Sequence, residues 1–224
     1  MRSMPSLMTD AVLNRSRINL TENTMNARFI QLGLAATLAA TFALPVFAQT
    51  AGSTQSDTAR DVAQQQRIES GLKSGQLSTR EAGKLEKGEA HVEKMEANAG
   101  RNGSVSAAEQ SRITAAQNRE SGAIYNQKHD AQVGNPASAS SQRMQADVQR
   151  NVNQQTRIEN GEKSGQLSTR ESASLERGQA QTDRATARAA ANGRVGVNEQ
   201  AGLQAREDRQ SARIAHKKHN GVTG

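Results

Sequence analysis

The sequence predicts an all-α protein: two tandem copies of a small three-helix unit, joined by a flexible linker and preceded by a cleaved signal peptide. Three observations support this fold class. The nonapeptide KSGQLSTRE occurs unchanged at residues 73–81 and 163–171. Its glycine, apolar residue, serine and glutamate have the spacing of a helix start with a capping box. An apolar run at residues 29–44 follows a short positive segment, as in secretory signal peptides.

The duplication extends far beyond the nonapeptide. At a constant shift of 90 residues, identities continue from Asp57/Asp147 to His129/His219 without a gap. The duplicated unit is therefore roughly 78 residues long, above the period of most stacked solenoids. Two copies of this length favour two small domains over a stacked array.

The N-terminal residues predict export. Residues 25–48 combine a positive start, an apolar stretch and small residues before Gln49, which is the pattern of a signal peptide. The alternative is a retained membrane anchor, although the apolar run is shorter than the roughly 20 residues of a membrane span. The absence of cysteine excludes a lipoprotein anchor and a disulfide framework. Residues 1–24 are interpreted as an unstructured gene-start extension ahead of Met25.

After cleavage the chain is poor in large apolar residues. Leu, Ile, Val, Met and Tyr make up 23 of 176 residues from Gln49 onward, and Tyr125 is the one aromatic. This composition is below the roughly 20% apolar content at which disorder becomes common, so a disordered stress-protectant is a rival interpretation. Agreement between caps, glycines and apolar spacing favours folded helices with a thin, alanine-rich core.

The elements follow in order. Residues 49–56 are expected to be a flexible tail, and residues 57–134 form the first repeat. Its helices are predicted at 57–69, 79–99 and 107–129, the second with an apolar seam that contains Leu85, Val92 and Met95. Residues 135–146 are expected to be the linker, and residues 147–224 repeat the plan.

The glycine turns also resemble degenerate EF-hand loops, in which glycine occupies position 6 and glutamate position 12. This alignment gives a low-affinity calcium hypothesis, although neither loop begins with aspartate. The candidate ligands in the two most favourable loops are Asn98, Asn102 and Glu109, and Asn160, Glu162, Ser164 and Glu171. A glycine turn followed by a capping box explains the same residues without any metal.

Other chemistry finds little support. His216 and His219 could ligate a metal, but positive side chains in a last helical turn also complement the helix dipole. Adjacent opposite charges, such as Glu86 and Lys87, indicate solvated helix faces. The net charge of +7 comes without a basic stripe or stacking aromatics, which argues against nucleic-acid binding. No nucleophile motif is present, and we expect no enzymatic activity.

The string at residues 67–81, the Asn-Gly pair at 102–103 and the segment at 124–130 resemble a group of uncharacterised exported repeat proteins of Gram-negative bacteria with degenerate EF-hand-like helix–loop–helix units. This resemblance covers both copies. It implies export and helical repeats, and it carries no activity. Copy two departs from it at Ala215, which stands where copy one has its tyrosine.

The sequence therefore favours a non-enzymatic periplasmic or secreted protein. Its expected role is that of an interaction or structural module. The partner would be another protein or a second copy of the chain, docked on the apolar seams, with nonspecific contact to anionic envelope surfaces. No cofactor is expected, apart from weakly bound calcium in the alternative interpretation.

Overall fold

The fold is all-α, as the sequence predicts. The computed structural model describes residues 50–221, and no strand occurs in that range. Its six helices are α1 (Thr50–Ser74), α2 (Thr79–Ala99), α3 (Ala107–Lys128), α4 (Ala139–Lys163), α5 (Thr169–Ala189) and α6 (Val197–Lys218). Two short 3-10 turns, η2 (Gly100–Asn102) and η3 (Ala190–Asn192), extend α2 and α5.

The expectations for the signal peptide and for residues 1–24 lie outside the described residues. Within residues 50–221, none of the helices is both long and apolar enough to cross a membrane.

Helix starts agree with the duplicated capping signals. Ser78 precedes α2, and its backbone N–H donates to Oε2 of Glu81 over 2.9 Å. Ser106 before α3 makes the same bond to Glu109 over 2.9 Å. In copy two the Ser168 N–H donates to Glu171 over 3.1 Å. These bonds satisfy backbone donors that a helix N-terminus otherwise leaves without partners.

Three expected boundaries are wrong. Helix α1 begins at Thr50, so residues 50–56 of the predicted flexible tail are helical, and α1 runs past Gly71 to Ser74. Gly75, at φ 78°, takes the left-handed conformation after the helix. The predicted linker is shorter than expected, because residues 139–146 belong to α4. Ser138 caps this helix by accepting from the Ser141 N–H over 3.1 Å.

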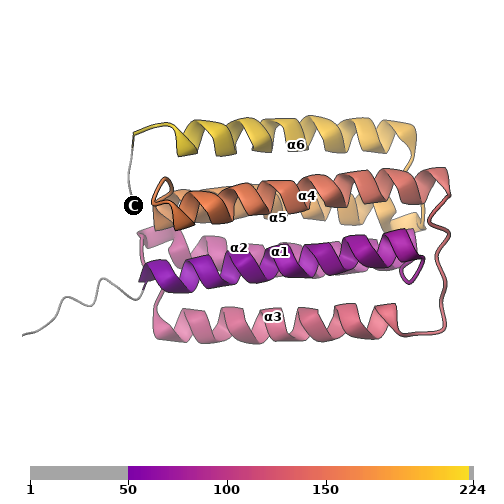
Figure 1. Cartoon of the computed structure of the whole chain (residues 1–224), viewed down its shortest axis with the longest axis horizontal. Helices are drawn as coiled ribbons and strands as arrows, with labels where there is room; N and C mark the ends of the chain where they lie inside the picture. Colours follow the sequence, from indigo (N-terminus) through magenta and orange to yellow (C-terminus); the bar gives the residue numbers. More distant parts are fainter. Residues whose placement is uncertain (1–49, 222–224) are drawn as a thin grey trace, which may run out of the picture. The chain divides into compact units, whose positions relative to one another are not determined.

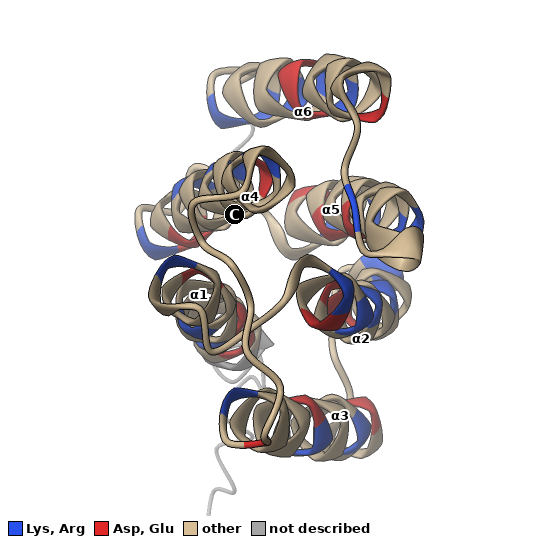
Figure 2. Ribbon diagram, turned by 90° about the vertical axis from the view of Figure 1, so that its right-hand side faces the viewer, with Lys and Arg blue, Asp and Glu red and all other residues tan. Residues whose placement is uncertain are grey.

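The helices of the two copies pack against each other. Within the unit Leu44–Gly224, α2 lies against α5 and α1 against α4, and these four helices form the centre. Helix α3 packs on α1 and α2, and α6 packs on α4 and α5, on opposite sides of the centre (Figures 1 and 2). One apolar cluster contains residues of both copies, among them Ile68, Leu85, Met144 and Leu203. The repeats therefore share a core.

The arrangement has an internal pseudo-twofold symmetry, because contacts occur in reciprocal pairs. A Cβ on Gly83 would lie 2.6 Å from Ala190, and a Cβ on Gly100 would lie 2.9 Å from Ala173. Each of these residues corresponds to one in the other pair at the shift of 90. Both contacts bring α2 and α5 together in antiparallel orientation. Glycine is required here, since a side chain would hold the helices apart.

The apolar seam expected to bind a partner is used inside the chain. Leu85 and Val92 are 2% and 1% exposed, and Ile113 and Ile124 are buried as well. Tyr125, Val133 and Val197 are the exposed large apolar residues of the described part. The seam therefore joins helices of the same chain.

Candidate metal centre

A row of acidic side chains lies in the middle of the four central helices. Helix α2 contributes Glu86, Glu89, Glu93 and Glu96, spaced three, four and three residues apart on one helix face. None of the four is more than 6% exposed. The interpretation of Glu86 as part of a solvated surface pair is therefore wrong.

The other central helices add further carboxyl groups and several amides. The acids that face this row are Asp61 on α1, and Glu176 and Asp183 on α5. Buried amides lie among them, namely Gln65, Gln117, Asn151 and Gln155.

The charge of this interior is one-sided. Fourteen Asp and Glu residues of the described chain are buried, and no Lys, Arg or His is among its buried residues. An ionised carboxylate in a protein interior is costly unless a positive charge or hydrogen-bond donors compensate it. Glu69, Glu159 and Glu207 form ion pairs with Lys73, Lys163 and Arg150 at the edge of this interior. The acids of the central row have no such partner within the described chain, so protons or bound cations must supply the positive charge there.

Three of these carboxyl groups converge. Asp61, Glu96 and Glu176 come from α1, α2 and α5, and one oxygen of each lies within 4.8 Å of those of the other two. Calcium ligands lie about 2.3–2.6 Å from the ion, so two ligands on opposite sides of one ion are about 5 Å apart. The three oxygens are close enough to surround a single ion.

Amide groups orient the three carboxylates. Nε2 of Gln117 donates to Asp61 over 2.8 Å and to Glu96 over 3.1 Å. Nε2 of Gln155 donates to Glu176 over 3.1 Å and to Glu93 over 2.9 Å. Each carboxylate of the triad thereby uses one oxygen and keeps the other without a donor. Hydrogen bonds of this kind hold the ligands of protein metal sites in position.

A small pocket borders two of the three triad residues. Glu96 and Glu176 both line it, together with Asp57, Thr58 and other residues of α1 and α5. Its volume is about 10 Å³. That is about the space of one water molecule or one bare ion.

Burial dominates the titration of these groups. It raises the pKa of Asp61 to about 7, against hydrogen bonds from Glu96 and Gln117 that lower it. The pKa values of Glu96 and Glu176 are raised well above their usual range, first by burial and then by the charge of Asp61. Asp61 and Glu96 are close enough to share a proton. Proton or cation occupancy would relieve the same repulsion.

Protonation alone is an expensive solution. Burial raises the pKa of Glu86 to about 8 from an ordinary 4.5. Holding this one group protonated at pH 7, where the unfolded chain has released the proton, costs about 3 kcal/mol of stability. A whole domain is typically stable by about 5–15 kcal/mol, and burial shifts several further carboxyl groups in the same direction.

The first of the predicted calcium loops is occupied by local hydrogen bonds. Glu109 caps α3, and hydrogen bonds from Ser106 lower the pKa of its carboxyl group. Oδ1 of Asn102 accepts from the Ser104 N–H over 2.9 Å. Asn98 is exposed near the end of α2 and lines a surface groove together with Glu109.

The second loop is similar. Glu171 accepts from the Ser168 N–H and also from Nδ2 of Asn220 over 2.5 Å. The Ser164 hydroxyl donates to the backbone oxygen of Asn160 over 2.8 Å. Glu162 is largely buried, and burial raises its pKa to about 7, with hydrogen bonds to Ser172 and Thr58 opposing the shift. Its closest partners thus belong to α5 and α1.

The histidines take no part in the acidic interior. His91, His129, His216 and His219 are all exposed, and His219 lies at the C-cap of α6. The ligands available in the interior are therefore oxygen atoms.

Sequence reasoning missed the buried triad, although one signal was present. Four glutamates on α2 recur on one helical face beside the apolar seam, where a soluble helix normally places apolar residues. Comparisons with models of known protein families, with curated proteins and with solved structures found no match for this chain.

Proposed function

We propose that this protein binds a divalent cation inside its four-helix centre, with Asp61, Glu96 and Glu176 as ligands. The observation that carries the proposal is the convergence of three carboxyl groups: one oxygen of each lies within 4.8 Å of the other two, and each group keeps one buried oxygen without a donor elsewhere in the described chain. The proposed role is binding, in agreement with the absence of a nucleophile motif in the sequence.

A second observation points to a missing positive charge at the same place. Glu89 is completely buried, and neither of its carboxylate oxygens has a hydrogen-bond donor. Burial raises its pKa, and the negative charge of Asp61 is the next largest cause. A proton shared by Asp61 and Glu96 would leave Glu89 and the free oxygen of Glu176 unsatisfied. A cation beside them offsets all of these charges at once.

The donor set selects the class of ion. Carboxylate oxygens suit hard cations such as Mg²⁺, Mn²⁺ and Ca²⁺, whereas zinc and copper sites in proteins usually contain histidine or cysteine. The chain has no cysteine, and the histidines of its described part are exposed. We therefore infer a hard divalent cation coordinated by oxygen alone, with water completing the shell.

Export and the helical repeat architecture remain part of the proposal. In a periplasmic or secreted setting, calcium and magnesium are the hard divalent cations that we expect to be most abundant. We do not extend the proposal to a protein partner, because the exposed large apolar residues of the described part are isolated, and single ones are normal on soluble proteins.

Metal binding by the chelator-treated chain tests the proposal. Equilibrium dialysis against Mn²⁺, Ca²⁺ or Mg²⁺ should show bound ion in the unaltered protein and none in the double variant D61N/E96T. These substitutions introduce the residue types that already occupy the pseudo-symmetric positions, Asn151 and Thr186, so we expect the variant to fold. Circular dichroism verifies that the variant folds.

The variant E109Q separates the core site from the calcium-loop alternative. It alters a loop candidate on the surface and should leave binding unchanged if the core holds the ion. Loss of binding in E109Q with retention in D61N/E96T would assign the ion to the loops and overturn the proposal. Absence of binding in the unaltered chain would show that protons neutralise the interior.

A further inference from the structure

The pseudo-twofold symmetry creates a second position equivalent to the triad. Asp61 corresponds to Asn151, Glu96 to Thr186, and Glu176 to Glu86. Glu93 and Asp183 correspond to each other, and their carboxyl groups lie close enough to interact. The symmetry axis therefore passes between these two residues, with the triad on one side. The mate position, defined as Glu86, Asn151 and Thr186, lies on the other.

The surrounding amides obey the same symmetry. Gln155 donates to Glu93 and Glu176 beside the triad. Gln65, its counterpart, donates to Asp183 over 3.3 Å and to Glu86 over 3.4 Å. The two positions thus have matching frames and differ in the residues placed at their centres.

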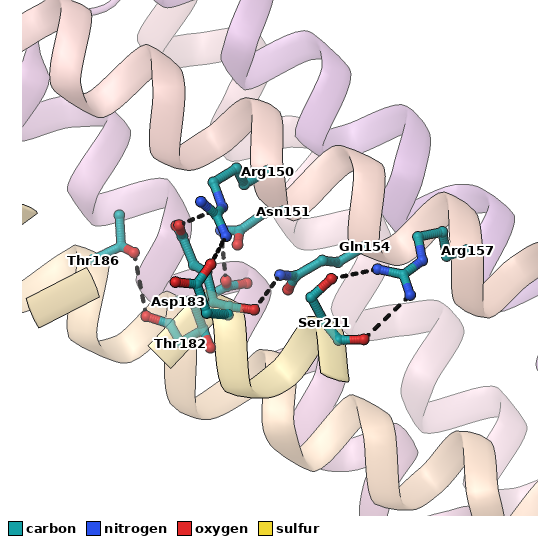
Figure 3. A network of polar contacts seen from close by, with 10 residues as sticks. Arg150, Asn151, Gln154, Arg157, Thr182, Asp183, Thr186 and Ser211 are labelled. Atoms are coloured by element: carbon teal, nitrogen blue, oxygen red, sulfur yellow. Dashed lines mark hydrogen bonds and ion pairs between the residues drawn. The ribbon is translucent and has the colours of Figure 1, made fainter. Parts of the chain in front are cut away.

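In the mate position an amide lies where the triad has a carboxylate. Nδ2 of Asn151 donates to Oδ1 of Asp183 over 2.8 Å and to Oε2 of Glu86 over 3.3 Å. The Thr186 hydroxyl donates to the backbone oxygen of Thr182 over 3.2 Å. Figure 3 shows Asn151 directed toward Asp183, and Thr186 bonded along its own helix toward Thr182.

This difference changes the charge available to a cation. The triad positions hold three carboxyl groups, whereas the mate positions hold only that of Glu86. A primary amide has two N–H donors, so the Asn151 side chain satisfies carboxylate oxygens that a cation would otherwise bind. Ligand charge is a main determinant of affinity for hard cations.

We infer that the chain binds one cation and that Asn151 and Thr186 keep the mate position free of a second. This inference rests on the proposed function and adds its stoichiometry and the residues that determine it. The duplicated units thus have different roles: the first supplies two ligands of the occupied position, and the second supplies the third ligand together with the neutral side chains of the mate.

Reciprocal exchange of the differing residues tests the inference by ion-to-chain ratio. With Mn²⁺ as probe, counted by equilibrium dialysis and electron paramagnetic resonance, the unaltered chain should bind one ion. The variant N151D/T186E should bind two. The four-residue exchange D61N/E96T/N151D/T186E should bind one, now at the mate position.

The outcomes separate the two proposals. A ratio of zero in the unaltered chain overturns the proposed function, and the inference with it. A ratio of two in the unaltered chain retains the proposed function and overturns the inference, as does a folded N151D/T186E variant that still binds one. If that variant does not fold by circular dichroism, N151D alone serves. It should bind a second ion at least tenfold more weakly than the first, and no second ion at millimolar Mn²⁺ would refute the assignment.

Discussion

Replacing Glu86 by glutamine should stabilise the ion-free protein at neutral pH. Glu86 is completely buried on α2, and its Oε2 accepts from Gln65 and Asn151 over 3.4 and 3.3 Å. Burial raises the pKa of this carboxyl group to about 8 in the folded chain, from 4.5. Below pH 4.5 the group is protonated in both folded and unfolded chains and contributes no difference. Above it the unfolded chain releases the proton first, so stability falls until the folded pKa is reached.

The magnitude follows from these two pKa values. Between pH 4.5 and 8 the loss is about 1.4 kcal/mol for each pH unit, which gives about 3 kcal/mol at pH 7. Glutamine is neutral at every pH and keeps one acceptor oxygen, while its new N–H₂ group faces other amides at a cost of about 1 kcal/mol. The net expectation for E86Q is a gain of about 2 kcal/mol at pH 7 and a small loss at pH 4.

Urea unfolding followed by circular dichroism, in the presence of chelator, measures this difference at both pH values. The matched control is E109Q, whose carboxyl group is exposed and has its pKa lowered by hydrogen bonds from Ser106. A carboxyl group whose pKa is lower in the folded chain than in the unfolded chain stabilises the fold at pH values above the unfolded pKa, and this contribution is lost in acid. E109Q should therefore destabilise the protein at pH 7 and have almost no effect below pH 4. An E86Q effect that is the same at pH 4 and pH 7 would refute the reasoning.

Three further predictions concern the ion, the contact between repeats and a cap. A saturating hard cation at 100 times its Kd should raise the free energy of unfolding by about 2.7 kcal/mol in the unaltered chain and by nothing in D61N/E96T, measured by thermal melts at a series of concentrations. The variant G83A places a methyl group 2.6 Å from Ala190 and should cost about 1–3 kcal/mol of stability. The control G122A on α3 meets open space and should be neutral or stabilising by up to about 1 kcal/mol. Equal effects of the two variants in urea titrations would contradict the close approach of α2 and α5. Removing the capping hydroxyl in S78A should cost about 1 kcal/mol in the same titrations, and an unchanged midpoint would show that the cap of α2 is dispensable.

Local signals made the helices predictable. The serine and glutamate of each capping box lie three residues apart, so the sequence contains the whole interaction, and α2 has the bounds expected of it. The errors occurred where no local signal ends an element. Helix α1 continues through Gly71 because this glycine leaves room for Leu77, whose side chain folds back against it. A Cβ on residue 71 would lie 2.6 Å from the Leu77 side chain.

The row of glutamates on α2 was the one local signal of the acidic interior, and it does not by itself distinguish a buried face from a solvated one. Glu81 and Glu86 are the same residue type on the same helix, and one is a cap while the other is a core residue. The burial of Glu86 depends on α1, α4 and α5. Asn151, 65 positions away, donates to it, and Gln65 contacts Asp183 across 118 positions. Nothing within one turn of α2 records these neighbours, so the glutamates looked like a solvated face.

Covalent duplication explains how one such position can be retained without its mate. In a symmetric dimer of identical units, replacing an acid at the position of Asp61 would neutralise both sites together. Within one chain the two copies change independently, and the first has 11 basic and 11 acidic residues while the second has 13 and nine. Where the second copy has a neutral residue in place of an acid, the mate position has one fewer buried negative charge to offset. The amide of Asn151 instead donates to one oxygen of Asp183 and one of Glu86. The asymmetry therefore leaves Glu86 as the one carboxyl group among the mate residues and keeps the larger group of carboxylates at the position that a cation can fill.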